Sequence, residues 1–422
     1  MLFRDATLAD GRHVDVRVEG ERITAIGSRL SIGDDQVIDA GGKLLLPGAI
    51  DVHVHFREPG FSHKETWKTG SQSAAAGGVT TVVDQPNTEP PTVTGDAFDE
   101  KASLAADSFV DYGLNGGVVP DWDPDSLFER PLFALGEVFL ADSTGDMGIE
   151  ESLFRAAAER ARTEDTVVTV HAEDADLFDE SVRDRDDADA WSAFRTSNAE
   201  VAAVERACEI ATDVGVGLHV AHTSTPGGVR AASAAGATCE VTPHHLFLSR
   251  DDLEDLGTFG RMNPPLRAEP ERKELLELLV DGTIDVVATD HAPHTRAEKR
   301  ASIWDAPSGV PGVETMLPLL LEEARRDRLS YERLRDVTAL NPARIFGVPR
   351  KGRVTEGADA DLVLVDPDAT TDIQAEELHS KCGWTPFDGW SGVFPELTLV
   401  RGAIVYDREG GFGEAVGKNV RS

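Results

Sequence analysis

The stretch DVHVHFREPG at residues 51–60 is the part of the sequence from which the fold and the site can be inferred. It begins as a short apolar run in which His53 and His55 alternate with valine, the period of a β-strand. Side chains two residues apart on a strand point to the same side, so both imidazoles can bind one cation through neutral ring nitrogens. An isolated pair of this kind is as often two structural histidines. The role of this pair therefore has to be inferred from other residues of the sequence.

The region from residue 48 to about 345 alternates short apolar runs with Ala-, Glu- and Arg-rich stretches of helical period, which indicates repeated βα units. No GxGxxG follows the first strand, which argues against a dinucleotide-binding fold. Eight such strands with intervening helices predict an α/β fold of the (β/α)8 TIM-barrel type, whose chemistry lies at the strands' carboxyl ends. The candidate strands are residues 51–53, 81–83, 112–114, 137–139, 168–170, 218–220, 239–241 and 286–288.

The two ends of the chain carry a different pattern. Residues 1–47 alternate short β-like runs with Gly and Asp turns, and residues 346–422 return to β-like runs between Pro- and Gly-containing loops. We therefore expect both termini to build one small β-sheet domain beside a barrel of residues 48–345.

The amino-acid composition limits the classes of molecule that the protein can bind. The 422 residues contain 41 Lys plus Arg against 76 Asp plus Glu, a net charge of −35 that would repel nucleic acid and anionic membrane surfaces. Such self-repulsion is tolerated best where salt screens it, which predicts a salt-adapted source. The three cysteines form no CxxC pair, and neither an export signal nor an apolar run near the ~18 residues of a membrane helix is present. A cytoplasmic protein that binds neither nucleic acid nor membrane is expected.

Three further residues follow predicted strands directly: His171, His222 and Asp290. With His53 and His55 they place four histidines and one aspartate on one rim of the barrel. Five ligands exceed what one tetrahedral zinc with an open position needs, so two metal ions that share a bridging group are predicted. Zinc is favoured because nitrogen dominates the ligand set.

With these motifs the sequence resembles the amidohydrolase superfamily and, within its cyclic amidases, the dihydroorotases. The resemblance implies a zinc-dependent enzyme that reversibly hydrolyses L-dihydroorotate to N-carbamoyl-L-aspartate in pyrimidine synthesis. Several short motifs in the same order, each beyond a predicted strand, carry it. They are residues 51–60, 85–87 (QPN), 171–174 (HAED), 221–224 (AHTS), 262–267 (MNPPLR) and 290–294 (DHAPH).

The resemblance also implies how two zinc ions per subunit are held. His53, His55 and Asp290 would bind one ion, His171 and His222 the other, and a carboxylate of the fourth strand would bridge them. Many relatives use a carbamylated lysine there, but alignment of residues 137–145 places Glu137 at that position. Glu137 is the preferred bridge, and Asp142 is the alternative because some relatives use an aspartate shortly after this strand.

Catalytic and substrate-binding roles follow in the same way. Asp290, a ligand beside the activated water, can accept its proton and pass it to the leaving nitrogen. Arg57 lies two residues beyond His55 and can bind a carboxylate with its guanidinium fork. By resemblance, Arg57, Asn87 and His294 would hold the carboxylate of dihydroorotate. The pyrimidine ring would contact Asn263, the backbone of Ser308 and Gly309, and His55.

Two other functions remain open. An allantoinase or hydantoinase would share the barrel and the metals, but such relatives lack Arg57 and His294. A catalytically silent, dihydroorotase-like assembly partner would lack metal ligands, whereas all of them are present here. A small-molecule substrate is expected, and a homo-oligomer is compatible with the sequence.

Overall fold

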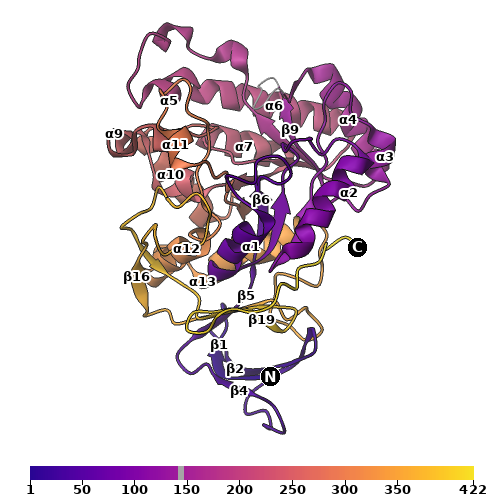
Figure 1. Ribbon diagram of the computed structural model, residues 1–422, viewed down its shortest axis with the longest axis vertical. Coiled ribbons are helices and arrows are strands. Elements are labelled where there is room, and N and C mark those ends of the chain that lie inside the picture. The colour runs from indigo at the N-terminus through magenta and orange to yellow at the C-terminus, as the bar shows by residue number, and fades with distance from the viewer. Residues whose placement is uncertain (141–146) are drawn as a thin grey trace.

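The computed structural model describes residues 1–140 and 147–422, and its central part is a barrel of parallel strands (Figure 1). Each of the eight predicted strands coincides with an observed strand or overlaps one, so the predicted (β/α)8 class is confirmed. In chain order the strands are β6 (Ala49–Val54), β7 (Val79–Asp84), β8 (Asp111–Leu114), β9 (Leu135–Leu140), β11 (Val168–Ala172), β12 (Leu218–Val220), β13 (Thr238–Val241) and β14 (Val286–Val287).

The barrel is closed where two parallel sheets meet. One sheet joins β6, β7 and β8, and the other joins the remaining five strands, with β10 (Gly148–Ile149) beside β9. Parallel bridges from Gly116 to Leu135 and from Val54 to His291 connect the sheets at both seams. Strand β6 is buried along its whole length, as expected for a parallel strand covered by helices. The histidine pair is therefore presented by a rigid, central strand.

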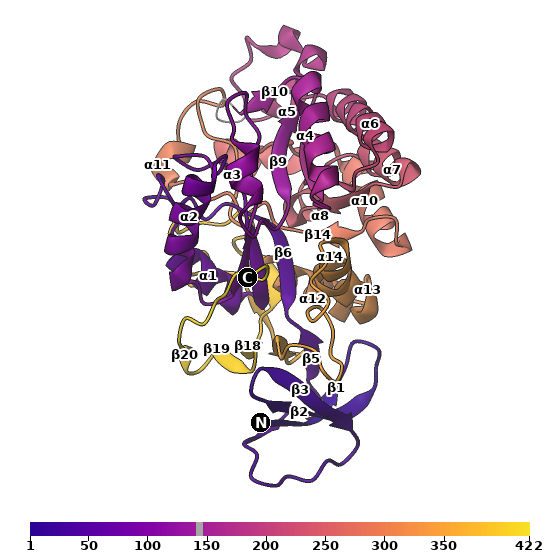
Figure 2. The same ribbon diagram turned by 90° about the vertical axis from the view of Figure 1, so that its right-hand side faces the viewer.

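The helices surround the strands in both views (Figures 1 and 2). Local signals set their ends: α6 starts after Thr196, whose hydroxyl accepts a hydrogen bond from the N–H of Ala199, and it stops at left-handed Gly215. The longer helices are α1 (Trp67–Ala76), α2 (Gly95–Leu104), α4 (Glu151–Thr163), α6 (Ser197–Val214), α7 (Pro226–Ala235), α10 (Glu269–Asp281) and α12 (Met316–Arg325). The shorter ones are α3 (Pro124–Phe128), α5 (Ala190–Phe194), α8 (Pro243–Phe247), α9 (Leu253–Leu256), α11 (Arg296–Lys299), α13 (Tyr331–Arg335) and α14 (Asn341–Ile345).

Both termini contribute to one nine-stranded sheet. The ends meet where β5 pairs antiparallel with β15, with Leu45 opposite Leu364, and the sheet buries an apolar cluster separate from the barrel core. Its strands are β1 (Leu2–Thr7), β2 (His13–Glu19), β3 (Arg22–Gly27), β4 (Val37–Asp39), β5 (Leu44–Pro47), β15 (Leu362–Val365), β18 (Leu397–Val400), β19 (Ala403–Asp407) and β20 (Gly411–Phe412). Strands β16 (Thr370–Asp372) and β17 (Ser391–Val393) form a separate pair. The expected small terminal β domain is therefore present, while its limits at residues 47 and 346 stay a prediction.

A buried lysine joins this sheet to the barrel. Lys351 Nζ lies 2.7 Å from a carboxylate oxygen of Asp111, the first residue of β8, and 2.5 Å from one of Asp361, next to β15. The terminal sheet thus lies at the amino ends of the barrel strands (Figure 2). The carboxyl ends, where the predicted site residues lie, face away from it. Within the described residues, we find no helix that is both long and apolar enough to cross a membrane.

Candidate active site

The barrel brings the predicted metal ligands together at the carboxyl ends of its strands. His53 lies in β6, Glu137 in β9 and His171 in β11. His55 follows β6 directly, and His222 and Asp290 follow β12 and β14 by a few residues. All six side chains are buried, so the rim predicted from the sequence is a real cluster.

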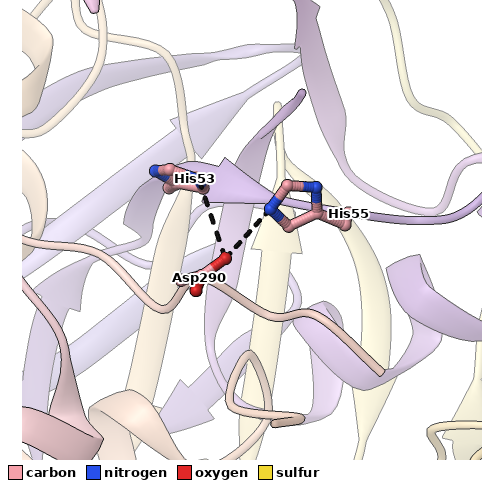
Figure 3. A group of neighbouring side chains, drawn as sticks. All are labelled: His53, His55 and Asp290. Atoms are coloured by element: carbon pink, nitrogen blue, oxygen red, sulfur yellow. Dashed lines mark hydrogen bonds and ion pairs between the residues drawn. The ribbon is translucent and has the colours of Figure 1, made fainter. Parts of the chain in front are cut away.

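The first group of ligands consists of His53, His55 and Asp290 (Figure 3). Asp290 Oδ1 lies 2.9 Å from His55 Nε2 and 3.7 Å from His53 Nε2. One histidine lies in β6 and the other directly follows it, while the aspartate follows the last barrel strand, β14. Two ring nitrogens and one carboxylate oxygen around one point are a typical zinc donor set.

The second group is centred on the carboxylate of Glu137. Its Oε1 lies 2.6 Å from His222 Nε2 and 3.2 Å from His171 Nδ1. Its Oε2 lies 3.4 Å from His53 Nε2, so the two oxygens face different histidines. Because His53 belongs to both groups, Glu137 stands between them. Asp142, the alternative bridge, lies outside the residues that the structure describes.

The cluster has the properties that a metal centre requires. In the part of the chain that the structure describes, His53 Nε2 and His222 Nδ1 are buried and have no hydrogen-bond partner. Leaving a buried polar atom unsatisfied costs about 1–3 kcal/mol. His53 Nε2 also lies within 4 Å of carboxylate oxygens of both Glu137 and Asp290, so a bound cation would satisfy all three. The donor set therefore fits divalent metal ions.

Backbone strain is concentrated at the same rim. Arg57, His222 and Asp290 adopt φ angles of 65°, 32° and 45°, a left-handed region that side-chain-bearing residues rarely enter. Such conformations cost roughly 1–3 kcal/mol each and persist where the surrounding structure enforces them. All three residues are predicted site residues that line the cavity.

Opposite charges surround His53. Burial disfavours its protonated form, but the carboxylates of Glu137 and Glu240 outweigh burial and raise the pKa of His53 well above its usual value. Burial also opposes ionisation of Glu137, yet His222 and His53 hold the pKa of Glu137 well below its usual value. The negative charge that stabilises a proton here would stabilise a divalent cation in the same way.

Glu240, within strand β13, orients ligands of both groups and was not predicted from the sequence. Its Oε1 accepts a hydrogen bond from His53 Nδ1 at 2.6 Å and from the backbone N–H of His222 at 3.1 Å. Its Oε2 lies 3.1 Å from His219 Nε2. A carboxylate behind a ligating histidine fixes the ring's tautomer and orientation and raises its basicity. The only sequence signal was an acidic residue inside a short strand.

Replacing Glu240 with glutamine should weaken metal binding, because the neutral amide oxygen accepts the hydrogen bonds from His53 and His222 more weakly than the charged carboxylate does. Loss of such an outer carboxylate typically lowers metal affinity about 10- to 100-fold. Competition with a chelator, followed by metal analysis, measures this change. Glu254→Gln, at an exposed position in α9, is the control, and equal affinities in the two variants would contradict the role of Glu240.

A cavity of about 310 Å³ opens beside the cluster. All seven residues predicted to contact the substrate line it, although their roles stay predictions. Trp191, Arg261 and Phe139 also line it and were missed in the sequence. The predicted residues are His55, Arg57, Asn87, Asn263, His294, Ser308 and Gly309.

One wall of the cavity is cationic. Arg57 Nη2 lies 3.1 Å from His294 Nε2, which also lies 2.9 Å from the carbonyl oxygen of Ser308. Lys64 Nζ lies 3.2 Å from His294 Nδ1. Burial, together with the charges of Arg57 and Lys64, keeps the pKa of His294 well below its usual value, so this imidazole is neutral. In a chain of net charge −35, this wall is a local cluster of positive charge.

Asn87 connects the predicted metal ligands to this wall. Its Oδ1 lies 2.7 Å from His55 Nδ1, on the ring edge opposite the nitrogen that faces Asp290. The contact fixes the orientation of the His55 ring. Asn87 therefore positions a predicted ligand in addition to lining the cavity.

Comparison with known proteins agrees with this geometry. A model of the amidohydrolase family matches residues 44–402, a span that includes every residue of the cluster. The chain belongs to the amidohydrolase family. Membership of this family implies a binuclear metal site, and the two overlapping ligand groups fit it.

Among amidohydrolases, a curated dihydroorotase of Halobacterium salinarum is 67% identical over 100% of this chain and 99% of its own length. A dihydroorotase of Methanosarcina mazei is 45% identical over 94% of this chain and 91% of its own. The solved L-hydantoinase of Arthrobacter aurescens superposes with a TM-score of 0.93 at 30% identity and covers 99% of this chain and 98% of its own. This amidohydrolase is thus a cyclic amide hydrolase, and the Halobacterium relative agrees with the salt-adapted source inferred from charge.

Proposed function

We propose that the protein is a dihydroorotase that reversibly hydrolyses L-dihydroorotate to N-carbamoyl-L-aspartate, a step of pyrimidine synthesis. The observation that carries this proposal is the cationic wall formed by Arg57 beside the metal ligands in a substrate-sized cavity. Dihydroorotate has a cyclic amide and a carboxylate, which match these two parts of the site. The dihydroorotases that the chain resembles over its whole length support the same substrate.

The proposed cofactor is a pair of zinc ions. His53, His55 and Asp290 would hold one ion, and His171 and His222 would hold the other, with Glu137 between them. When bound, such ions would lower the pKa of a water at the site toward neutral and polarise the carbonyl of the amide. Arg57, Asn87 and His294 would hold the ring carboxylate and so fix which carbonyl faces the ligands.

Asp290 would carry the proton in the reaction. The water oxygen adds to the ring carbonyl carbon C4, the bond from C4 to N3 breaks, and its electron pair stays on N3. Asp290, 2.9 Å from His55, accepts a proton from the water and delivers it to N3. The second proton of the water is released, because C4 ends as a carboxylate. In the reverse direction Asp290 removes the proton from the ureido nitrogen.

Replacing Arg57 with methionine tests the substrate. We expect kcat/KM for L-dihydroorotate to fall roughly 100-fold, because charge-assisted hydrogen bonds contribute about 1.5–3 kcal/mol each. Activity on dihydrouracil, the same ring without the carboxylate, should change little. Steady-state kinetics on both substrates measure the ratio, with Arg230→Met, an exposed arginine of α7, as the control.

The wild-type protein in the same assay separates the functions left open. A protein that hydrolyses hydantoin or allantoin but not dihydroorotate would be a neutral-ring cyclic amidase, which the fold of its hydantoinase neighbours allows. A protein inactive on every ring would be the silent assembly partner. The complete ligand set argues against that partner, and the cytoplasmic location and the homo-oligomer stay predictions.

A further inference from the structure

Arg261 is a cationic side chain that lines the cavity. It belongs neither to the two groups of predicted metal ligands nor to the cationic wall at Arg57. It lines the cavity together with Asn263 and Gly309. Its Nε and Nη1 atoms are buried, and residues 1–140 and 147–422 offer them no hydrogen-bond partner. Among the residues that the structure describes, no carboxylate lies within ion-pair distance of it. An arginine with free, buried donors in a substrate cavity is expected to bind a substrate oxygen.

The position of Arg261 is fixed from two sides. Its guanidinium carbon lies 3.7 Å from the centre of the Trp191 ring, whose Nε1 donates a hydrogen bond to Asn263 Oδ1 at 3.0 Å. Its carbonyl oxygen accepts hydrogen bonds from Lys299 Nζ at 2.8 Å and from the N–H of Gly309 at 3.1 Å. The free donors are therefore held in place before a substrate arrives, which reduces the entropic cost of binding.

The shape of a six-membered ureide ring indicates which substrate oxygen the free donors of Arg261 would contact. In the proposed dihydroorotase reaction, C4 faces the metal ligands and the carboxylate on C6 faces Arg57. The third ring substituent is the oxygen on C2, which then points to the remaining polar wall of the cavity. That wall carries Arg261, Asn263 and Gly309.

We propose that Arg261 donates hydrogen bonds to the C2 oxygen of the ring and stabilises the nitrogen that leaves. This inference rests on the proposed dihydroorotase function. When the bond from C4 to N3 breaks, its electron pair on N3 is conjugated with the C2 carbonyl, so negative charge develops on the C2 oxygen. A fixed guanidinium at that oxygen stabilises the transition state more than the ground state. Arg261 is thus a catalytic residue that selects rings with a ureide carbonyl.

The test compares L-dihydroorotate with its 2-thio analogue, in which a weakly accepting sulfur replaces the C2 oxygen. For Arg261→Met, kcat on dihydroorotate should fall roughly 10- to 100-fold, with a smaller change in KM. The preference of the wild type for oxygen over sulfur should largely disappear in the variant. Arg261→Lys should be intermediate, because it keeps the charge but loses the fork. Arg230→Met is the matched control, and metal content and the thermal unfolding midpoint verify folding.

The comparison of substrates separates a catalytic role from a structural one. If Arg261 only supports Trp191, Arg261→Met slows both substrates by the same factor, and the inference is wrong. Unchanged kinetics in the variant overturn it as well. A wild-type protein that does not turn over dihydroorotate contradicts the proposed function instead, so the two failures are distinguishable.

Discussion

Replacing Asp290 with asparagine is expected to lower kcat on dihydroorotate by about 10³-fold or more, which is within the contribution that positioned acids and bases make. Burial opposes ionisation of Asp290, but its bond with His55 and the charge of His53 outweigh burial and hold its pKa below the usual value. The wild-type side chain is therefore a carboxylate that can accept a proton. An asparagine of the same shape keeps an oxygen toward His55 and His53 but cannot accept and return a proton.

Steady-state kinetics together with metal analysis measure this effect. Metal content is the essential second readout, because Asp290 is also a predicted ligand. A preparation of Asp290→Asn that keeps its metal but turns over slowly supports the proton-transfer role. Asp251→Asn, an exposed aspartate near α9, is the control. Normal turnover in metal-loaded Asp290→Asn would refute the role of Asp290.

The barrel and most of its site could be predicted because both follow from local sequence patterns. Helices cover the outside of a parallel barrel, so its strands are buried on both faces and appear as short apolar runs. The carboxyl ends of those strands meet at one rim, so a polar residue just past each run becomes a site candidate. His171 and His222 were predicted in this way, from position relative to a strand.

Residues placed by contacts distant in sequence could not be predicted in this way. Trp191 reaches the cavity from α5, and it stacks on Arg261 across seventy positions of sequence. No periodicity in the local sequence predicts such a contact. For Arg261 itself the one local signal was its position two residues before Asn263, a predicted site residue. Glu240 lies within β13 and not beyond its end, so a rule that selects polar residues past a strand does not select it.

Glu137 and Asp142 are the two candidates for the bridging carboxylate, and their variants should differ sharply. Glu137→Gln is expected to lose at least one of the two proposed metal ions and to lower kcat by about 10³-fold or more, since the proposed bridge would hold both ions and balance their charge. Asp142→Asn should keep both metals. Metal content per chain after gel filtration, with kcat on dihydroorotate, measures both variants.

The geometry favours Glu137 for a reason that does not depend on alignment. Its Oε1 is 2.6 Å from His222 and its Oε2 is 3.4 Å from His53, so one carboxylate already spans a ligand from each proposed zinc site. Glu137 is buried and lies within strand β9, which holds its carboxylate in this position. The longer side chain of a carbamylated lysine is therefore not needed to reach both groups. A glutamine retains one oxygen but replaces the other with an amide that cannot coordinate, so it cannot serve both ions. If Asp142→Asn loses metal while Glu137→Gln retains it, the bridge belongs to Asp142, and Glu137 is reduced to orienting His222.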